Sequence, residues 1–205
     1  TTAPAAVSSV SDGSGADIAY STSGATITAN WPATTDSESG VAAYWYSIGT
    51  SAGASNTVSW TSNGANRVIA HGGLALADGT TYYVSVKAIN NSGLFSGVST
   101  SDGQLVDTTV PATGGAAVKD GPYNDVSYAS TSSQLTANWS GFSDPHSGVS
   151  RYYYGIGTSA GSTAVTGGWI DVSTATTVTK TGLSLNDGQT YYFTVTAENN
   201  AGLVS

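Results

Sequence analysis

Short stretches in which apolar and polar residues alternate recur along the chain, and no stretch shows the 3.6-residue period of a helix. Residues 27–31 read ITANW, residues 41–48 read VAAYWYSI and residues 82–89 read YYVSVKAI. A period of two predicts half-buried β-strands. Further strands are expected at residues 57–61, 67–70 and 97–107. Because about seven short strands with turns such as Asp78-Gly79 between them are typical of a sandwich, the pattern predicts an all-β fold.

The whole pattern occurs twice. YWYSIGTSAG at 44–53 returns as YYYGIGTSAG at 152–161, and residues 74–96 return as residues 183–205 after one extra residue near Trp169. A chain of 205 residues has the length of two modules of about 100 residues each. The repeat therefore predicts two tandem sandwiches, residues 1–108 and residues 109–205.

The second copy stops at a point equivalent to residue 96 of the first. It is therefore expected to lack the last strand, which residues 97–107 form in the first copy. Two explanations are open. Either the chain is a piece of a longer protein, or a neighbouring chain donates the strand to an unpaired sheet edge.

Particular residues carry a resemblance to a known family. A Trp closes an alternating strand in both copies (Trp31 and Trp139). Leu76 to Asn90 and Leu185 to Asn199 share the pattern Tyr-x-Val/Phe-x-Val-x-Ala-x-Asn after a Gly-Thr or Gly-Gln turn. In these features the chain resembles tandem fibronectin type III modules. The resemblance implies an immunoglobulin-like sandwich with a tyrosine corner, in which the hydroxyl of Tyr82 or Tyr191 bonds back to the backbone.

The chain also departs from that family. It lacks the usual Pro-rich first strand and carries an extended DGxxxD segment at 12–17 and again at 120–125. Its sequence, rich in Ser, Thr and Gly, is similar to the sequences of modules from large bacterial surface and secreted proteins. We therefore expect an extracellular or cell-surface location. Residues 1–4 do not resemble a signal peptide, so an internal or processed segment is expected.

Charge limits the possible partners. Charged residues make up 9% of the chain and the net charge is −8. The five Lys and Arg residues are scattered, whereas a phosphate-binding surface clusters them. We therefore expect no nucleic-acid binding. We also expect no insertion into a membrane, because no apolar stretch is long enough to span one.

The residues that carry most catalysis are scarce. The chain has two His (His71 and His146), two Glu (Glu38 and Glu198) and no Cys. Neither His recurs in the other copy, and a nucleophile, a base and an orienting group must meet in space for a triad. Zinc requires several His or Cys ligands at short spacing. The chain is therefore predicted to be neither an enzyme nor a zinc protein.

Calcium is the one ion that the carboxylates favour, because it prefers clustered oxygen ligands. Two Asp pairs recur in the copies and a third pair precedes the second copy. The six candidates are Asp12, Asp17, Asp102, Asp107, Asp120 and Asp125. Asp beside Gly also forms turns, so a turn role and a calcium site are both open. No other cofactor is expected.

Aromatic residues on the outward faces of the strands form a third group of candidates. In each copy they fall on strands that neighbour one another in this fold, and exposed rings stack on sugars or mark a contact surface. The candidates are Trp45, Trp60 and Tyr83 in the first copy and Tyr153, Trp169 and Tyr192 in the second. Cross-strand packing that stabilises the sheet is the alternative role.

These observations predict a non-catalytic structural or spacer pair in a large extracellular protein of adhesin or fibre type, with neighbouring modules as its partners. Two alternatives remain. One is a carbohydrate-binding accessory module of a secreted polysaccharide-degrading enzyme, with polysaccharide as the partner. The other is a filament subunit assembled by strand donation, with another copy of the chain as the partner.

Overall fold

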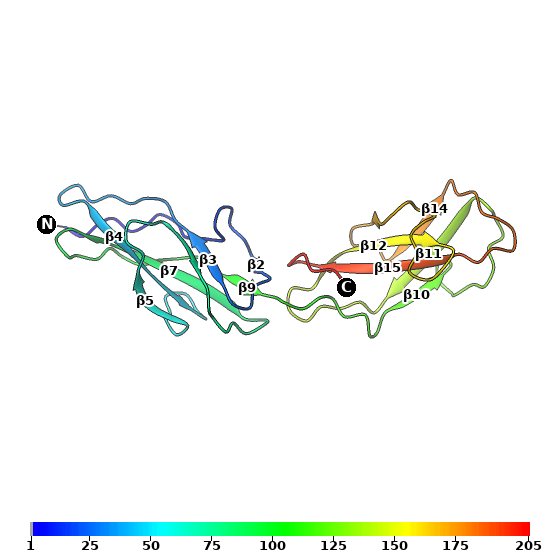
Figure 1. Cartoon of the computed structure of the whole chain (residues 1–205), viewed down its shortest axis with the longest axis horizontal. Helices are drawn as coiled ribbons and strands as arrows, with labels where there is room; N and C mark the ends of the chain where they lie inside the picture. Colours follow the sequence, from blue (N-terminus) through cyan, green and yellow to red (C-terminus); the bar gives the residue numbers. More distant parts are fainter. Residues whose placement is uncertain (1) are drawn as a thin grey trace. The chain divides into compact units, whose positions relative to one another are not determined.

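The computed structural model describes residues 2–205. The chain divides into two compact units, Thr1–Thr108 (unit 1) and Thr109–Ser205 (unit 2) (Figure 1). All regular structure in the described residues is β-strand. Nothing in this part of the chain forms a helix that could cross a membrane. The predicted all-β, immunoglobulin-like sandwich class is confirmed.

Unit 1 contains two sheets. The smaller has the order β1-β3-β6 and is antiparallel throughout. The larger has the order β2-β9-β7-β4-β5, with β8 also paired to β7; only β2 and β9 run parallel. The strands are β1 (Ser11–Asp12), β2 (Tyr20–Ser21), β3 (Ile27–Asn30), β4 (Val41–Gly49), β5 (Val58–Ser62), β6 (Val68–His71), β7 (Thr81–Asn90), β8 (Ser99–Thr100) and β9 (Gln104–Val106).

The core of unit 1 contains the alternating residues that the sequence pattern singles out. Apolar side chains from β3, β4 and β7 are buried together. Trp31 and Tyr44 contact each other with ring centroids 6.0 Å apart. Ile27, Ile48 and Val84 are completely buried, and burying a side chain of this size stabilises a fold by about 1.5–3 kcal/mol. The period of two thus assigns the core face of these strands correctly.

Unit 2 repeats this arrangement with fewer strands. One sheet has the order β10-β11-β14 and the other has the order β13-β12-β15. Their bounds are β10 (Ala117–Asp120), β11 (Gln134–Ser140), β12 (Val149–Gly157), β13 (Ile170–Asp171), β14 (Thr177–Thr181) and β15 (Tyr192–Asn199). Asp120 pairs with Ala137 as Asp12 pairs with Ala29, so the copies share their register. Among the described residues, no strand of unit 2 corresponds to β2 or β9.

Two details differ from the strands expected from sequence. A short first strand exists in each unit (β1 and β10), where the sequence indicated only the DGxxxD segment. The predicted last strand, 97–107, is divided into β8 and β9. At the break, Ser101 exchanges two hydrogen bonds with the backbone of Val84. Gly103 has φ +99°, and a Cβ there would lie 2.7 Å from Tyr83, so this position needs glycine.

The tyrosine corner is present in both units. The hydroxyl of Tyr82 accepts a hydrogen bond from the backbone N–H of Ala77 at 2.9 Å. Tyr191 accepts the equivalent bond from Asn186, also at 2.9 Å. This bond ties the loop before β7 or β15 to its strand, as the resemblance to fibronectin type III modules implied.

Candidate functional site

An outward-facing cluster of rings lies on the larger sheet of unit 1. Trp45 on β4 is paired with Lys87 on β7 and contacts Phe95 edge-on, with centroids 6.0 Å apart. The ammonium of Lys87 lies 4.2 Å from the ring centroid of Trp60 and 4.3 Å from that of Phe95. Both distances are within the range of a cation–π interaction. In unit 1, therefore, an internal cation already occupies the predicted aromatic surface.

The equivalent surface of unit 2 is hollow. Tyr153 is paired with Thr196, as Trp45 is paired with Lys87. A pocket of about 220 Å³ is lined by Tyr153, Trp169, Thr196, Glu198 and Val204. The Trp169 side chain is 49% exposed. The hydroxyl of Tyr153 donates a hydrogen bond to a Glu198 carboxylate oxygen at 2.5 Å, which raises the pKa of Tyr153.

The other two aromatic candidates lie elsewhere on the same sheets. Tyr83 is paired with Gly49 and packs against Gly103. Tyr192 is paired with Gly157 and is 41% exposed. Each lies four residues along its strand from Lys87 or its unit 2 equivalent Thr196, which is about 13 Å at the usual rise of a strand. Neither therefore joins its ring cluster.

Three of the six calcium candidates come together. Carboxylate oxygens of Asp12, Asp17 and Asp102 lie within 4.8 Å of one another. Asp12 is buried, and its oxygens accept hydrogen bonds from the N–H of Gly103 at 2.9 Å and from the amide of Gln104 at 3.0 Å. Burial raises the pKa of Asp12, and these hydrogen bonds oppose the rise.

These contacts give the cluster a structural role. An oxygen of Asp17 accepts the backbone N–H of Asp12 at 2.7 Å, and Asp125 accepts that of Asp120 at 3.0 Å. The recurring DGxxxD pair therefore closes a loop in both units. Ca²⁺ takes about six to eight oxygen ligands, whereas several oxygens here already accept N–H groups. Asp107 is buried at the end of β9. Calcium binding stays a prediction.

A hydrogen-bond network that sequence reasoning missed surrounds Asn90, which is 2% exposed. Its amide nitrogen donates to the Thr2 carbonyl at 2.8 Å and to Asp36 at 3.0 Å. Its oxygen accepts the N–H groups of Ser92 at 3.1 Å and Leu94 at 2.9 Å. The bond from Asn90, together with backbone N–H groups, lowers the pKa of Asp36 to about 2.

Unit 2 contains the same network. Asn199 donates to the Thr109 carbonyl at 3.0 Å and to Asp144 at 3.1 Å, and it accepts the N–H of Leu203 at 2.8 Å. Burial opposes a fall in the pKa of Asp144, but the hydrogen bonds from Asn199 and from three backbone N–H groups lower it. The only sequence signal for this network is that the same Asp and Asn recur in both copies.

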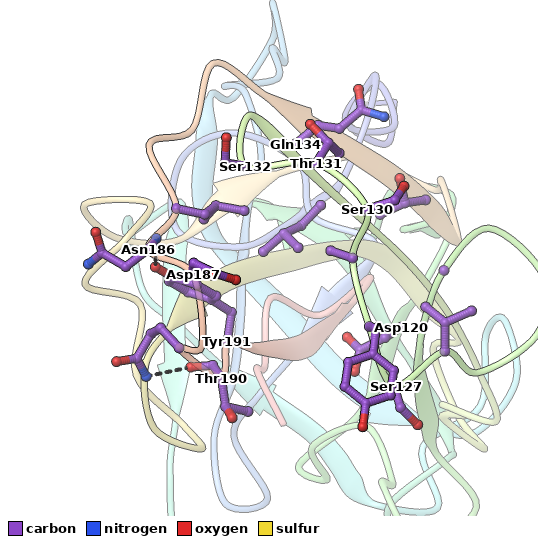
Figure 2. Close-up of a pocket in the computed structure, with 18 of the residues that line it drawn as sticks. Asp120, Ser127, Ser130, Thr131, Ser132, Gln134, Asn186, Asp187, Thr190 and Tyr191 are labelled. Carbon is purple, nitrogen blue, oxygen red and sulfur yellow. Dashed lines mark hydrogen bonds between the residues drawn. The ribbon is translucent and has the colours of Figure 1, made fainter.

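A second, larger hollow lies in unit 2. It is a groove of about 1040 Å³, and Figure 2 shows Asp120 and Ser127 on one side of it and Asn186, Asp187 and Tyr191 on the other. The side chains that reach it are mostly hydroxyl, amide and carboxylate groups. These groups suit the hydrogen-bonding edge of a peptide better than an apolar ligand.

The two histidines occupy structural positions. His71, at the end of β6, forms a hydrogen bond of 2.6 Å through Nδ1 with the hydroxyl of Tyr46. The backbone N–H of His146 donates to Asp144 in the loop before β12. His71 is paired with Ile27 across the strands, whereas Glu198, which lines the pocket of unit 2, is paired with Arg151. Each histidine thus contacts a residue of its own unit.

Comparison with known proteins adds little to this assignment. Neither protein-family models nor curated proteins yield a match to the sequence. Among solved structures, the FN1-FN3 domains of chicken CNTN1 match over 99% of this chain at 14% identity, with a TM-score of 0.31. The chain spans 64% of the length of that structure. The fold assignment rests on the strand order and the tyrosine corners described above.

Proposed function

We propose that the two units are non-catalytic structural modules that act as a spacer in an extracellular or cell-surface protein. The observation that carries the proposal is the way in which the residues around the unit boundary are fastened. A spacer keeps its length only if successive modules are joined without a free linker, because flexible linkers behave as random coils.

Each side of the boundary is bound to its own unit. The N–H of Thr108 donates to a carboxylate oxygen of Asp78 at 2.8 Å in unit 1. The carbonyl of Thr109 accepts the amide of Asn199 at 3.0 Å in unit 2. Asp107 before this pair and Pro111 after it are both completely buried. These contacts fasten Thr108 within unit 1 and Thr109 within unit 2, and so support the proposal that the modules are joined by a short connection rather than by a long free linker.

The distribution of distances between the units tests this proposal. The chain has no native cysteine, so spin labels can be placed at Ser51→Cys and Ser159→Cys, two equivalent exposed positions. Electron–electron double resonance should give a narrow distance distribution. Asp78→Ala should broaden the distribution, because it releases Thr108. A broad distribution in the parent chain would contradict the spacer role.

A matched control lies in the other unit. Asp187 occupies the same Asp-Gly turn of unit 2 as Asp78 does in unit 1. Asp187→Ala therefore makes the same chemical change away from the boundary and should leave the distribution unchanged. If both variants broaden it equally, the effect comes from destabilised modules rather than from the junction.

A second candidate function, assembly by strand exchange, is favoured by the groove in unit 2. In unit 1, β9 is held by hydrogen bonds from Gln104 to Asp12 and to the Thr28 carbonyl, both 3.0 Å. Leu105 donates to the Ala19 carbonyl at 2.9 Å, and the carbonyl of Val106 accepts the N–H of Gly79 at 2.8 Å. The equivalents of these four partner residues all line the groove: Asp120, Thr136, Ser127 and Gly188.

The groove therefore has the partners that a strand like β9 requires. We propose that it accepts a strand with the sequence of residues 101–108, supplied by another copy of the module. A synthetic peptide of residues 99–110, added to the whole chain, should protect backbone amides of β15 and of residues 126–129 from hydrogen exchange. The same peptide with Gln104→Ala and Val106→Asp should not. Equal protection by both peptides would refute strand exchange and leave the spacer proposal untouched.

A further inference from the structure

The ring clusters of the two units differ at four positions. Trp45, Lys87, Ile89 and Phe95 of unit 1 correspond to Tyr153, Thr196, Glu198 and Val204 of unit 2. The long cation and one ring are replaced by small side chains, and an apolar residue is replaced by a carboxylate. In unit 1, the ammonium of Lys87 fits against the ring of Trp60. Unit 2 retains the equivalent ring, Trp169, but has Thr196 in place of the lysine.

The pocket in unit 2 carries negative charge. The Glu198 carboxylate lies at its edge and accepts the hydroxyl of Tyr153 at 2.5 Å. Arg151, which is paired with Glu198 across the strands, forms an ion pair with Asp171 at 2.8 Å and also interacts with Tyr153 and Glu198. One carboxylate therefore lines the pocket, and a guanidinium and a second carboxylate lie beside it, so the local charge stays negative. Because carboxylates beside aromatic faces favour cations, the local charge points to a positively charged ligand.

We propose that the pocket lined by Trp169, Tyr153, Thr196, Glu198 and Val204 binds a primary alkylammonium group from outside the unit. The ammonium lies over the face of Trp169, as Lys87 lies over Trp60, and its charge is balanced by Glu198. The alkyl stem lies along Val204. This binding site goes beyond the spacer role and does not depend on it.

The same features disfavour a neutral sugar. A sugar ring stacks on a broad flat surface, whereas the two candidate rings here border a hollow of only about 220 Å³. A hollow of that volume can hold a butylammonium ion but not an oligosaccharide. The chain's net charge of −8 also attracts cations over a distance.

Two sources can supply the ligand, a lysine side chain of a protein partner or a free amine, and they can be told apart. The probes are Nα-acetyl-lysine methylamide and n-butylammonium, each compared with a neutral analogue of the same shape, Nα-acetyl-6-hydroxynorleucine methylamide and n-butanol. The readout is the indole N–H signal of Trp169 in the NMR spectrum of the whole chain, assigned with Trp169→Phe. Binding should be about tenfold tighter for each ammonium than for its neutral analogue.

Unit 1 provides an internal control in the same spectrum. Because Lys87 already lies over Trp60, the indole signal of Trp60 should not move. Thr196→Lys recreates the unit 1 arrangement and should abolish binding at Trp169. Thr196 also bonds to Ser205, and Thr196→Lys breaks that contact. The deciding variant is therefore Glu198→Gln. That change keeps an acceptor for Tyr153 but removes the charge, and it should weaken ammonium binding about fivefold.

Tighter binding of the lysine derivative than of n-butylammonium would identify a protein lysine as the ligand, and equal binding would identify a free amine. Several results would overturn the proposal. These are equal binding of neutral and charged probes, undiminished binding by Glu198→Gln, or an equal shift at Trp60. A shift of Trp169 with neutral oligosaccharides but not with ammonium probes would replace the proposal with sugar binding.

Discussion

Replacing Asn90 by alanine should destabilise unit 1 strongly, although Asn90 contributes nothing to the apolar core. Its side chain makes four hydrogen bonds, of 2.8, 3.0, 3.1 and 2.9 Å, and one of them is to the carboxylate of Asp36. A net value of about 1 kcal/mol for each bond, reduced because water can enter the space, gives a loss of about 3 kcal/mol. For a module of this size, such a loss lowers the melting temperature by about 12–20 °C.

The assay is chemical denaturation of the whole chain, followed by hydrogen exchange so that each unit is measured separately. Asn90→Ala should reduce the free energy of unfolding of unit 1 and leave unit 2 unchanged. Asn199→Ala should do the reverse, because its network is equivalent. A loss below about 1 kcal/mol in both variants would be the value of a single net hydrogen bond. That result would show that water replaces the network, and the reasoning would be wrong.

Three further predictions follow from the same contacts. The pKa of Asp36 is about 2 in the folded protein, against about 4 in the unfolded chain. The ionised Asp36 therefore stabilises unit 1 fully above pH 4, and this stabilisation is lost as the pH falls toward 2. Asp36→Asn should reduce the difference between melting temperatures measured at pH 4.5 and at pH 2.5. Tyr82→Phe removes the bond to Ala77 and should cost about 1–2 kcal/mol in urea denaturation. Ile48→Ala empties a fully buried site and should cost about 2–5 kcal/mol by the same assay, whereas a cost below 1 kcal/mol would mean that the core collapses around the cavity.

The sequence predicts the strands and their core faces well because burial imposes a period of two directly on the residues. Ile27, Ala29 and Trp31 are all buried, as their alternation indicates. The break between β8 and β9 could not be predicted in the same way. It depends on Ser101 bonding to Val84 and on Gly103 passing close to Tyr83, and both contacts join residues far apart in the sequence.

The candidate sites show the same limit. Outward rings such as Trp45 and Tyr153 could be assigned from strand phase, but which rings meet depends on cross-strand register. Tyr153 on β12 lies opposite Thr196 on β15 and lines the pocket. Tyr192 is also on β15, but it lies four residues from Thr196 and outside the pocket. The Asn90 network was missed for a related reason: Asn in a turn sequence reads as a turn former, and nothing local reveals that three separate segments bond to it.

The internal duplication separates structural residues from candidate functional ones. The Asp-Asn network, the tyrosine corner and the DGxxxD loop keep the same Asp, Asn and Tyr side chains and equivalent hydrogen bonds in both units. Because each satisfies buried or backbone polar groups, a change in either copy would carry a cost in stability. The ring cluster carries a weaker constraint, since its rings lie on the outward faces of the strands. There the copies differ in charge and in size, from Lys87 to Thr196 and from Ile89 to Glu198. The surface that the fold leaves free to vary is therefore where the two units acquire different binding properties, and the pocket beside Trp169 is the place to measure it.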